Sequence, residues 1–283
     1  MRRTVTKQEI ERFLSTREIG RGTFGVVHKG TLDDGDVAIK VLHVTEDTKE
    51  KAEREITTMR TVKHENIVEF IAELDEKPKL YLIFEFMDGP SLHKIIHNHN
   101  DHKYTNGDAI NWLTQAAEGL NHLHSLTPKL IHRDVKPKNI LLNSDKSIVK
   151  LCDFGNVRPR GSCMSNESGT HRYMSPEVYN GVEYTEKCDV YSFAITVWEV
   201  YSRTNAYGSD IPNDHKLLTK VSTENWRPLL EGIPEYTHDL LKRSWSNEPT
   251  SRPTMKEILE DLKKTDFCEN SIKQTLITAV SPS

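Results

Sequence analysis

The sequence HRDVKPKN, residues 132–139, lies between two short apolar runs, KLI at 129–131 and ILL at 140–142. A turn between two strands needs only a few residues such as Asn, Asp, Gly or Pro. This segment holds four basic side chains, one Asp, one Pro and one Asn. An acid, several cations and an amide in one loop indicate a site where these groups act together.

Composition narrows the classes of protein to consider. The chain has 283 residues, of which 36% are hydrophobic and 28% charged, as in a large globular domain or two closely packed lobes. A net charge of −4 disfavours a nucleic-acid partner, and no apolar run is long enough to cross a bilayer. The four cysteines form no CxxC pair, so we expect reduced thiols in a cytosolic protein.

Hydrophobic periodicity predicts an α+β fold with two lobes. Strand-like runs and one helical period in the first third of the chain predict a small β-rich lobe with a single helix. The strand-like runs are residues 19–30, 37–42 and 80–86, and the helical period covers 45–62. Later patterns are helical, and residues 190–201 are apolar on nearly all sides. We therefore expect a larger helical lobe around that buried helix, with a loosely held tail after Phe267.

The stretch GRGTFGVV, residues 20–27, contains three glycines spaced G-x-G-x-x-G. Alone this spacing is weak, because it serves both a dinucleotide fold, where it opens a helix, and a strand–turn–strand flap over nucleotide phosphates. Here Val26 and Val27 continue as a strand, and no helical period follows. The flap is therefore favoured, with glycines that let backbone N–H groups approach phosphate.

The stretch VAIK places Lys40 in an otherwise apolar strand. A buried ammonium is costly unless it is paired. One interpretation is a lysine on an edge strand that faces water. The other pairs Lys40 with phosphate and with an acid on the following helix, where Glu55 is favoured over Glu53.

The central segment then has a chemical interpretation. Asp134 could accept a proton from an attacking hydroxyl group, and Lys136 could neutralise a phosphate during transfer. Asn139 and Asp153, the latter in the stretch DFG at 153–155, supply the hard oxygen ligands that Mg²⁺ prefers.

Taken together and in this order, these pieces resemble the protein kinase signature set. The resemblance covers residues 15–264. The matching positions are Gly20, Gly22, Gly25, Lys40, Glu55, Asp134, Asn139, Asp153, Ser175-Pro176-Glu177, Asp189 and Arg252. It implies a bilobal kinase fold with an N-lobe at about 15–86 and a C-lobe at about 88–264. Residues 1–14 are then an N-terminal extension, and residues 265–283 are a short C-terminal tail.

Within the family, Lys136-Pro137 and Thr170 resemble the serine/threonine kinases rather than the tyrosine kinases. The stretches DVYSFAITVWEVYSR and SWSNEPTSRPTM resemble the tyrosine-kinase-like branch. More narrowly, CDFG and YTEKCDVYSFAITVWEV are similar to the transforming-growth-factor-β-activated group of MAP kinase kinase kinases. This resemblance implies a cytoplasmic enzyme of stress and innate-immune, JNK-type signalling. Its partners would be protein substrates, MAP kinase kinases among them, and an activating adaptor.

The resemblance also assigns site residues for ATP and Mg²⁺. Catalysis would use Lys40, Glu55, Asp134, Lys136 and Thr170, and Mg²⁺ would be held by Asn139 and Asp153. The ATP contacts would be Ile19, Gly20, Arg21, Gly22, Thr23, Phe24, Gly25, Val26, Val27, Ala38, Lys40, Glu85, Met87 and Leu141, with Ser91 near the ribose. Phe84 would narrow the space behind the adenine. Activating phosphorylation, with Arg133 as its cation, is expected at Ser162, Ser165 or Thr170.

Three alternatives stay open at this point. The chain could be a kinase-fold scaffold that binds partners and transfers little phosphate, because a fold does not guarantee activity. It could prefer tyrosine, although Lys136 argues against this. The histidines His93, His97, His99 and His102 could form a zinc site, but a solvated helix end is the favoured interpretation because a closed site needs four well-placed ligands.

Overall fold

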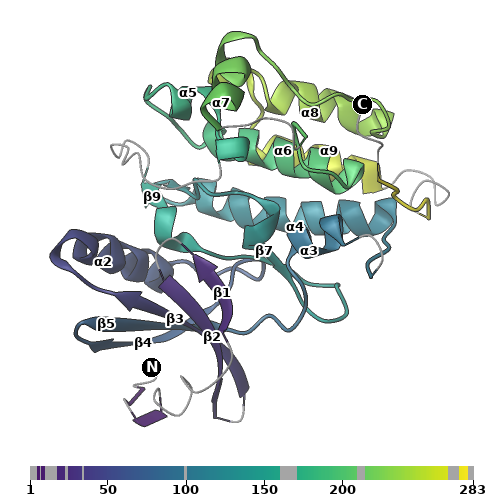
Figure 1. The fold of residues 1–283 in the computed structure, drawn as a ribbon. Coiled ribbons are helices and arrows are strands. Elements are labelled where there is room, and N and C mark those ends of the chain that lie inside the picture. The colour runs from purple at the N-terminus through teal and green to yellow at the C-terminus, as the bar shows by residue number, and fades with distance from the viewer. Residues whose placement is uncertain are drawn as a thin grey trace.

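A computed structural model describes residues 5–6, 8–9, 18–22, 25–33, 35–98, 101–159, 171–208, 214–266 and 274–279. In these residues a five-stranded sheet with one long helix forms the smaller lobe, and a mainly helical lobe lies beside it (Figure 1). The predicted α+β architecture, with a small N-terminal lobe and a larger helical one, is confirmed.

The N-lobe is an antiparallel sheet in the order β1-β2-β3-β5-β4. Its strands are β1 (Glu18–Gly22), β2 (Gly25–Leu32), β3 (Gly35–His43), β4 (Phe70–Glu76) and β5 (Lys79–Glu85). The β2–β3 hairpin pairs Leu32 with Gly35 at the turn. Because side chains alternate along a strand, Ile39 packs on one face of β3, while Lys40 and Leu42 lie on the face toward the long helix.

Helix α2 (Glu46–Thr61) covers one face of this sheet (Figure 1). It matches the helical period expected at 45–62 to within one residue at each end. Among the side chains of α2 that the structure describes, Ala52, Glu55 and Met59 are buried toward the sheet and the second lobe, spaced three and four apart. Two of them are apolar and contribute to packing, while the third is a carboxylate buried next to β3.

The C-lobe is built around α6 (Lys187–Ser202), which is buried along nearly its whole length, as expected for residues 190–201. Its other helices are α3 (Leu92–His97), α4 (Asn106–Ser125), α5 (Pro176–Tyr179), α7 (Asp214–Thr223), α8 (His238–Ser244) and α9 (Met255–Asp266). Helix α4 begins with a capping box between Thr105 and Asp108, which satisfies backbone donors at its first turn.

Short elements carry the loops that face the N-lobe. The strands are β6 (Leu130–Ile131), β7 (Ile140–Leu142), β8 (Val149–Leu151) and β9 (Arg158–Pro159). The 3₁₀ turns are η1 (Pro137–Asn139), η2 (Phe154–Asn156), η3 (His171–Tyr173), η4 (Glu235–Thr237) and η5 (Pro249–Ser251). Strand β6 pairs with β9, and β7 pairs with β8, so residues 132–139 are held between two short antiparallel pairs.

A stack of apolar and aromatic side chains joins the two lobes. Met59 on α2 and Phe154 on η2 are buried in one core cluster, and Phe70 on β4 packs against it. The rings of Phe154 and His132 meet at 5.2 Å between centroids. Met59, Phe70, His132 and Phe154 thus pack together across the boundary between the lobes.

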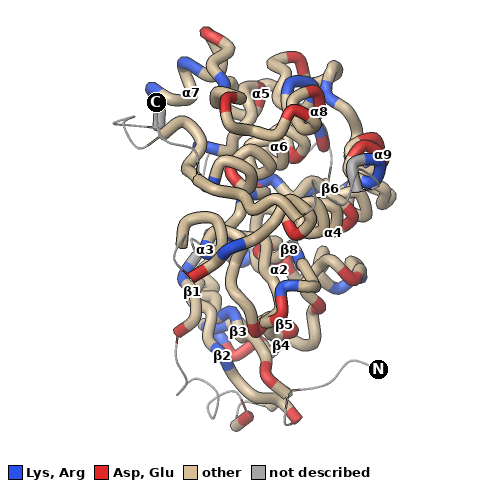
Figure 2. The backbone as a smooth tube through the Cα atoms, turned by 90° about the vertical axis from the view of Figure 1, so that its right-hand side faces the viewer, with Lys and Arg blue, Asp and Glu red and all other residues tan. Residues whose placement is uncertain are grey.

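Acidic and basic residues are interspersed over both lobes (Figure 2). This distribution agrees with the small formal net charge of −4. Within the described part of the chain, we find no helix with the length and apolar character that crossing a membrane requires. Electrostatic attraction of a binding partner would therefore come from local charged groups rather than from the net charge of the protein.

The expectation of a loosely held tail is wrong for residues 274–279, which dock on the C-lobe. Asn106 N–H donates to the Thr275 carbonyl at 3.0 Å, and Ile277 N–H donates to the Tyr104 carbonyl at 3.0 Å. The Ile277 side chain is only 8% exposed and joins the main core cluster. Two backbone hydrogen bonds and one buried aliphatic side chain hold this segment, and they give no periodic pattern in the sequence.

We predict that Ile277→Ala lowers the free energy of unfolding by about 2 kcal/mol, because it removes buried methyl groups and leaves a cavity. The neighbouring Leu276 is 55% exposed, so Leu276→Ala is the matched control, with an expected change below about 0.5 kcal/mol. Both are measured from denaturant midpoints of the full chain. Equal, negligible effects would show that the tail is not docked in solution.

Candidate active site

The loop at residues 132–139 is anchored by one buried carboxylate on α6. Asp189 is fully buried and accepts hydrogen bonds from the backbone N–H groups of His132 and Arg133, both at 2.8 Å. The His124 ring donates a third bond, also at 2.8 Å. Burial alone would raise the pKa of Asp189, but the bond and charge of His124 outweigh it and hold that pKa below its usual value. The loop is therefore fixed by an ionised group.

The ring of His132 fixes the next turn of the same loop. Its Nε2 donates to the Cys152 carbonyl at 3.1 Å, and its Nδ1 accepts from the Asp134 N–H at 3.3 Å. Arg133 between them has a φ of 67°, a left-handed conformation that is costly for a non-glycine residue. The bonds to Asp189 hold Arg133 in that conformation.

Asp134, Lys136 and Asn139 converge as the sequence predicts. Lys136 Nζ lies 2.8 Å from Asp134 Oδ1, and Asn139 Nδ2 donates to Asp134 Oδ2 at 2.9 Å and to the Asp134 carbonyl at 2.8 Å. Burial raises the pKa of Asp134, and Lys136 only partly offsets this effect. A raised pKa makes this carboxylate a better proton acceptor than an exposed Asp.

Lys40 is buried and ion-paired, as the second of the two sequence interpretations requires. Its Nζ lies 2.7 Å from Glu55 Oε1 on α2 and 3.1 Å from Asp153 Oδ1 in the other lobe. Burial would lower the pKa of Lys40, but the charges of Glu55 and Asp153 dominate and raise it. The rival Glu53 is exposed on another face of α2. One cation thus connects the sheet, its helix and the C-lobe.

Asn139 and Asp153 offer oxygen atoms that fit a divalent cation such as Mg²⁺. The backbone of residue 152 donates to the Asn139 carbonyl at 3.0 Å, which places the two segments side by side. The Asn139 amide nitrogen is used by Asp134, so the side-chain oxygen is the atom that can act as a ligand. Burial would raise the pKa of Asp153, but Lys40 dominates and lowers it, so this carboxylate is ionised. The donor set is therefore one carboxylate and one amide oxygen.

Most of the described residues predicted to contact the adenine and phosphates lie on adjacent strands of the sheet and on β7, and Met87 follows β5. Val27 pairs with Lys40 across β2–β3, and Ala38 pairs with Phe84 across β3–β5. Leu141, Met87 and Phe84 pack, partly buried, against the main core. Other predicted contacts within the described residues are Ile19, Gly20, Arg21, Gly22, Gly25 and Val26 on β1 and β2, and Glu85 at the end of β5.

The third glycine of the loop also has a packing role. At Gly25, φ is +156°, and a Cβ atom there would lie only 2.3 Å from the Val41 carbonyl oxygen. A larger residue would therefore clash with β3 whether or not phosphate binds. Thr23 and Phe24, between the second and third glycines, lie outside the described residues.

Two predicted contacts have other partners in the structure. The Arg21 guanidinium bonds the Glu18 carboxylate at 2.8 Å and is largely exposed. The Ser91 side chain accepts from the Lys94 N–H at 3.4 Å and caps α3. Both arrangements follow from the local sequence. Glu18 lies three residues before Arg21, and Ser91 is at the N-cap of α3, where serine is a preferred residue.

Glu85 has a side-chain role that sequence reasoning missed. Glu85 is one of the ATP contacts that the family resemblance implies. Its carboxylate accepts from the Glu69 N–H at 2.6 Å and pairs with Lys150 Nζ on β8 at 2.7 Å. Glu85 ends β5, so this pair ties the segment between the lobes to the C-lobe. The only sequence signal is a charged residue at the end of an apolar strand.

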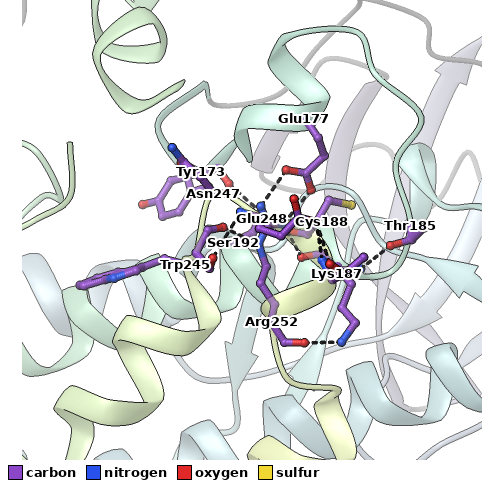
Figure 3. A network of polar contacts seen from close by, with 12 residues as sticks. Tyr173, Glu177, Thr185, Lys187, Cys188, Ser192, Trp245, Asn247, Glu248 and Arg252 are labelled. Atoms are coloured by element: carbon purple, nitrogen blue, oxygen red, sulfur yellow. Dashed lines mark hydrogen bonds and ion pairs between the residues drawn. The ribbon is translucent and has the colours of Figure 1, made fainter. Parts of the chain in front are cut away.

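The segment after the DFG stretch is anchored at its far end by a second buried ion pair (Figure 3). The Arg252 Nη1 and Nη2 atoms donate to the two carboxylate oxygens of Glu177, at 2.7 and 2.8 Å. Arg252 also donates to the carbonyls of Ser246 and Lys187, and Lys187 donates to the Arg252 carbonyl. Glu177 and Arg252 are both among the positions that match the kinase family. Ser162, Ser165 and Thr170, which precede it, lie outside the described residues.

The histidine cluster does not show a metal site within the described residues. There we find no group of three or more His, Cys, Asp or Glu side chains placed to hold a metal ion. The rings of His93 and His97 instead contact each other, with centroids 4.4 Å apart. His99 lies outside the described residues.

Glu199 is a further buried carboxylate that sequence reasoning missed. It accepts from the Tyr173 hydroxyl at 2.7 Å and from the Ala206 N–H at 2.8 Å, and it is fully buried on α6. Burial outweighs these bonds and raises the pKa of Glu199 to about 7. Tyr173 lies on η3, so this hydrogen bond connects η3 to the central helix α6.

We predict that Glu199→Gln stabilises the protein at pH 8 by about 1–3 kcal/mol and changes its stability little at pH 5. The folded state holds the Glu199 proton more tightly than the unfolded state, whose pKa is near 4.5. That stabilisation is complete below about pH 4.5 and is lost as the pH rises through about 7, whereas glutamine stays neutral.

Chemical denaturation at the two pH values measures this effect. The exposed Glu224 is the matched control, because Glu224→Gln should give no gain at either pH. A Glu199→Gln variant that is equally or less stable than wild type at pH 8 would contradict the assignment.

Comparison with known proteins agrees with this geometry. The family model described as protein kinase domain matches residues 13–262. Mitogen-activated protein kinase kinase kinase 7 of Drosophila melanogaster is 39% identical over 243 residues, which are 86% of this chain and 36% of the relative. The human protein of that name is 35% identical over 244 residues, 86% of this chain and 40% of the relative.

A third relative is the putative mitogen-activated protein kinase kinase kinase 7-like protein of Drosophila melanogaster. It is 36% identical over 251 residues, which cover 87% of this chain and 64% of that protein. The chain therefore spans less than two thirds of the length of these relatives. The family match covers both lobes and every residue of the site described above. The chain belongs to the protein kinase family.

Proposed function

We propose that the protein is a serine/threonine kinase of the MAP kinase kinase kinase type, which transfers the ATP γ-phosphate to Ser or Thr of MAP kinase kinases. The observation that carries this proposal is the complete catalytic arrangement. Lys40 contacts both Glu55 and Asp153, and Asp134 is held by Lys136 and Asn139. The relatives named above support the assignment to this type of kinase.

The residues divide the work of transfer between them. Lys40 would bind the α- and β-phosphates of ATP, oriented by Glu55. Asp134 would accept the proton of the substrate hydroxyl group. The hydroxyl oxygen would then form a bond to the γ-phosphorus while the bond from that phosphorus to the ADP oxygen breaks. Lys136 would stabilise the negative charge on the phosphoryl group in transfer. Asp153 and Asn139 would hold Mg²⁺, which neutralises charge on the phosphates when it is bound.

Activation and cellular setting complete the proposal. Phosphorylation of Ser162, Ser165 or Thr170 would activate the kinase, with Arg133 as the cation that binds the phosphate. The enzyme would act in the cytoplasm, in stress and innate-immune JNK-type signalling, with an activating adaptor as a partner. The alternative, a kinase-fold scaffold, is disfavoured because it does not need a buried lysine paired with two carboxylates.

We predict that Asp134→Asn lowers phosphate transfer to a MAP kinase kinase by about 100- to 10,000-fold, because the proton acceptor is lost. The substitution keeps the size of the side chain and a group that can bond Lys136. Transfer is measured with labelled ATP and Mg²⁺, and mapping the modified peptides identifies the acceptor residues, including Ser162, Ser165 and Thr170 of the kinase itself. Equal rates in both proteins, or label on tyrosine alone, would refute the assignment.

We predict that Glu55→Gln lowers kcat/KM for the same reaction by about 10- to 100-fold, because Lys40 loses the partner that orients it. Glu53, exposed on the same helix, provides the control. Glu53→Gln makes the same chemical change and should stay within about twofold of wild type. If the two variants behave alike, α2 does not contribute its carboxylate to the active state.

A further inference from the structure

Two histidine rings meet where the segment after α2 reaches the C-lobe. His64 lies three residues after the end of α2, and His122 lies in the last turn of α4. Their rings stack with centroids 4.8 Å apart and an angle of 30° between the ring planes. The proposed phosphate transfer uses neither ring. The contact joins a segment that follows the N-lobe helix to a helix of the C-lobe.

A hydrogen bond sets the protonation of the first ring. The Asn66 N–H donates to His64 Nδ1 at 3.0 Å. Only an Nδ1 atom without a proton can accept this bond, so protonation of that atom would turn the acceptor into a donor and break the bond. The stacked ring of His122 adds a second penalty. If both rings were protonated, two like charges would lie within about 4–6 Å of each other, and such a pair disfavours the charged forms.

The surroundings do not compensate a positive charge on the second ring. Burial lowers the pKa of His122, and the charge of His64 lowers it further. Among the described residues, no carboxylate contributes to this shift in the pKa of His122. The charged residues on the neighbouring segments are Lys63 and Glu65, exposed on either side of His64, Arg60 of α2 paired with Glu73, Glu118 of α4 paired with Lys263 of α9, and Lys150 of β8 paired with Glu85.

The segment that begins at His64 also joins α2 to the strand that leads into the DFG stretch. The Leu151 N–H donates to the Asn66 carbonyl at 2.9 Å, and the Val68 N–H donates to the Leu151 carbonyl at 3.0 Å. Residues 66–68 therefore run parallel to β8. The Asn66 side chain adds hydrogen bonds to β8 and α4. The position of α2 thus depends on a segment whose first turn closes on the histidine pair.

We propose that His64 and His122 form a pH-sensitive latch, which holds the segment after α2 on the C-lobe while both rings are neutral and releases it when they are protonated. The contribution of His122 to stability is complete above about pH 6.5, the ordinary pKa of histidine. It is lost as the pH falls below that value, because the open state then binds the proton more tightly than the closed state. Release would loosen α2, which carries the Glu55 partner of Lys40.

Amide hydrogen exchange on the full chain tests the latch without depending on kinase activity. Protection factors, corrected for the intrinsic pH dependence of exchange, are compared at about pH 7.5 and about pH 6. The reporters are the N–H groups of Val68 and Leu151, and the β2–β3 hairpin is the internal reference. We expect protection of both reporters to fall by about 3- to 10-fold at the lower pH relative to the hairpin, as one or two groups with an open-state pKa near 6.5 require. An unchanged ratio would overturn the latch.

Variants without titratable rings assign the effect to the pair. His64→Asn keeps an oxygen that can accept from the Asn66 N–H, and His122→Phe keeps an aromatic ring for stacking. The double variant should show the same protection at both pH values. His43→Asn, at an exposed histidine at the end of β3, is the matched control and should show the wild-type fall.

A fall of wild-type size in the double variant would overturn the latch, because other groups would then cause it. If the double variant does not fold, the two single variants decide the question in the same way. Each should lose part of the pH effect, and a full wild-type fall in both would refute the proposal.

Discussion

The arrangement of the active site depends on a carboxylate buried at the start of the central helix. Asp189 has no exposed surface, and a buried charge without partners costs several kcal/mol. Its partners are two consecutive backbone N–H groups and one imidazole, so the charge is satisfied only when the loop at 132–134 adopts its left-handed turn. The strain at Arg133 is therefore offset by the bonds that the carboxylate would otherwise lack. The stable helix α6 thus dictates where Asp134 is presented.

From this fixed loop, the contacts spread to both lobes. The His132 ring bonds the Cys152 carbonyl, next to Asp153. The Asp153 carboxylate in turn pairs with Lys40 in the N-lobe. Lys40 in turn holds Glu55 and hence helix α2. These groups are useful only as a set, because phosphate transfer depends on positioning and on charge stabilisation. A shift of α2 would leave Lys40 without a partner from its own lobe.

Sequence reasoning succeeds where a residue type has one plausible partner. A lysine in an apolar strand needs an acid, and helical spacing leaves Glu55 on the inner face, so the pair could be predicted. The pairing of Glu177 with Arg252 comes from the family resemblance. The docking of Ile277 could not be predicted, because it depends on a tertiary surface formed by residues 104–106. The raised pKa of Glu199 could not be predicted for a related reason. Its burial follows from its position inside α6, while its pKa depends on Tyr173 and Ala206 from other segments.

The central claim is that this arrangement turns over ATP by transferring phosphate to a protein hydroxyl group. The most direct measurement counts ADP formed and phosphoryl groups gained by a MAP kinase kinase in the same reaction with Mg²⁺. The structure predicts near-equal amounts, with the phosphate on serine or threonine. ADP formed without protein phosphate, or ATP bound without any ADP formed, would contradict the account and favour a scaffold built on the kinase fold.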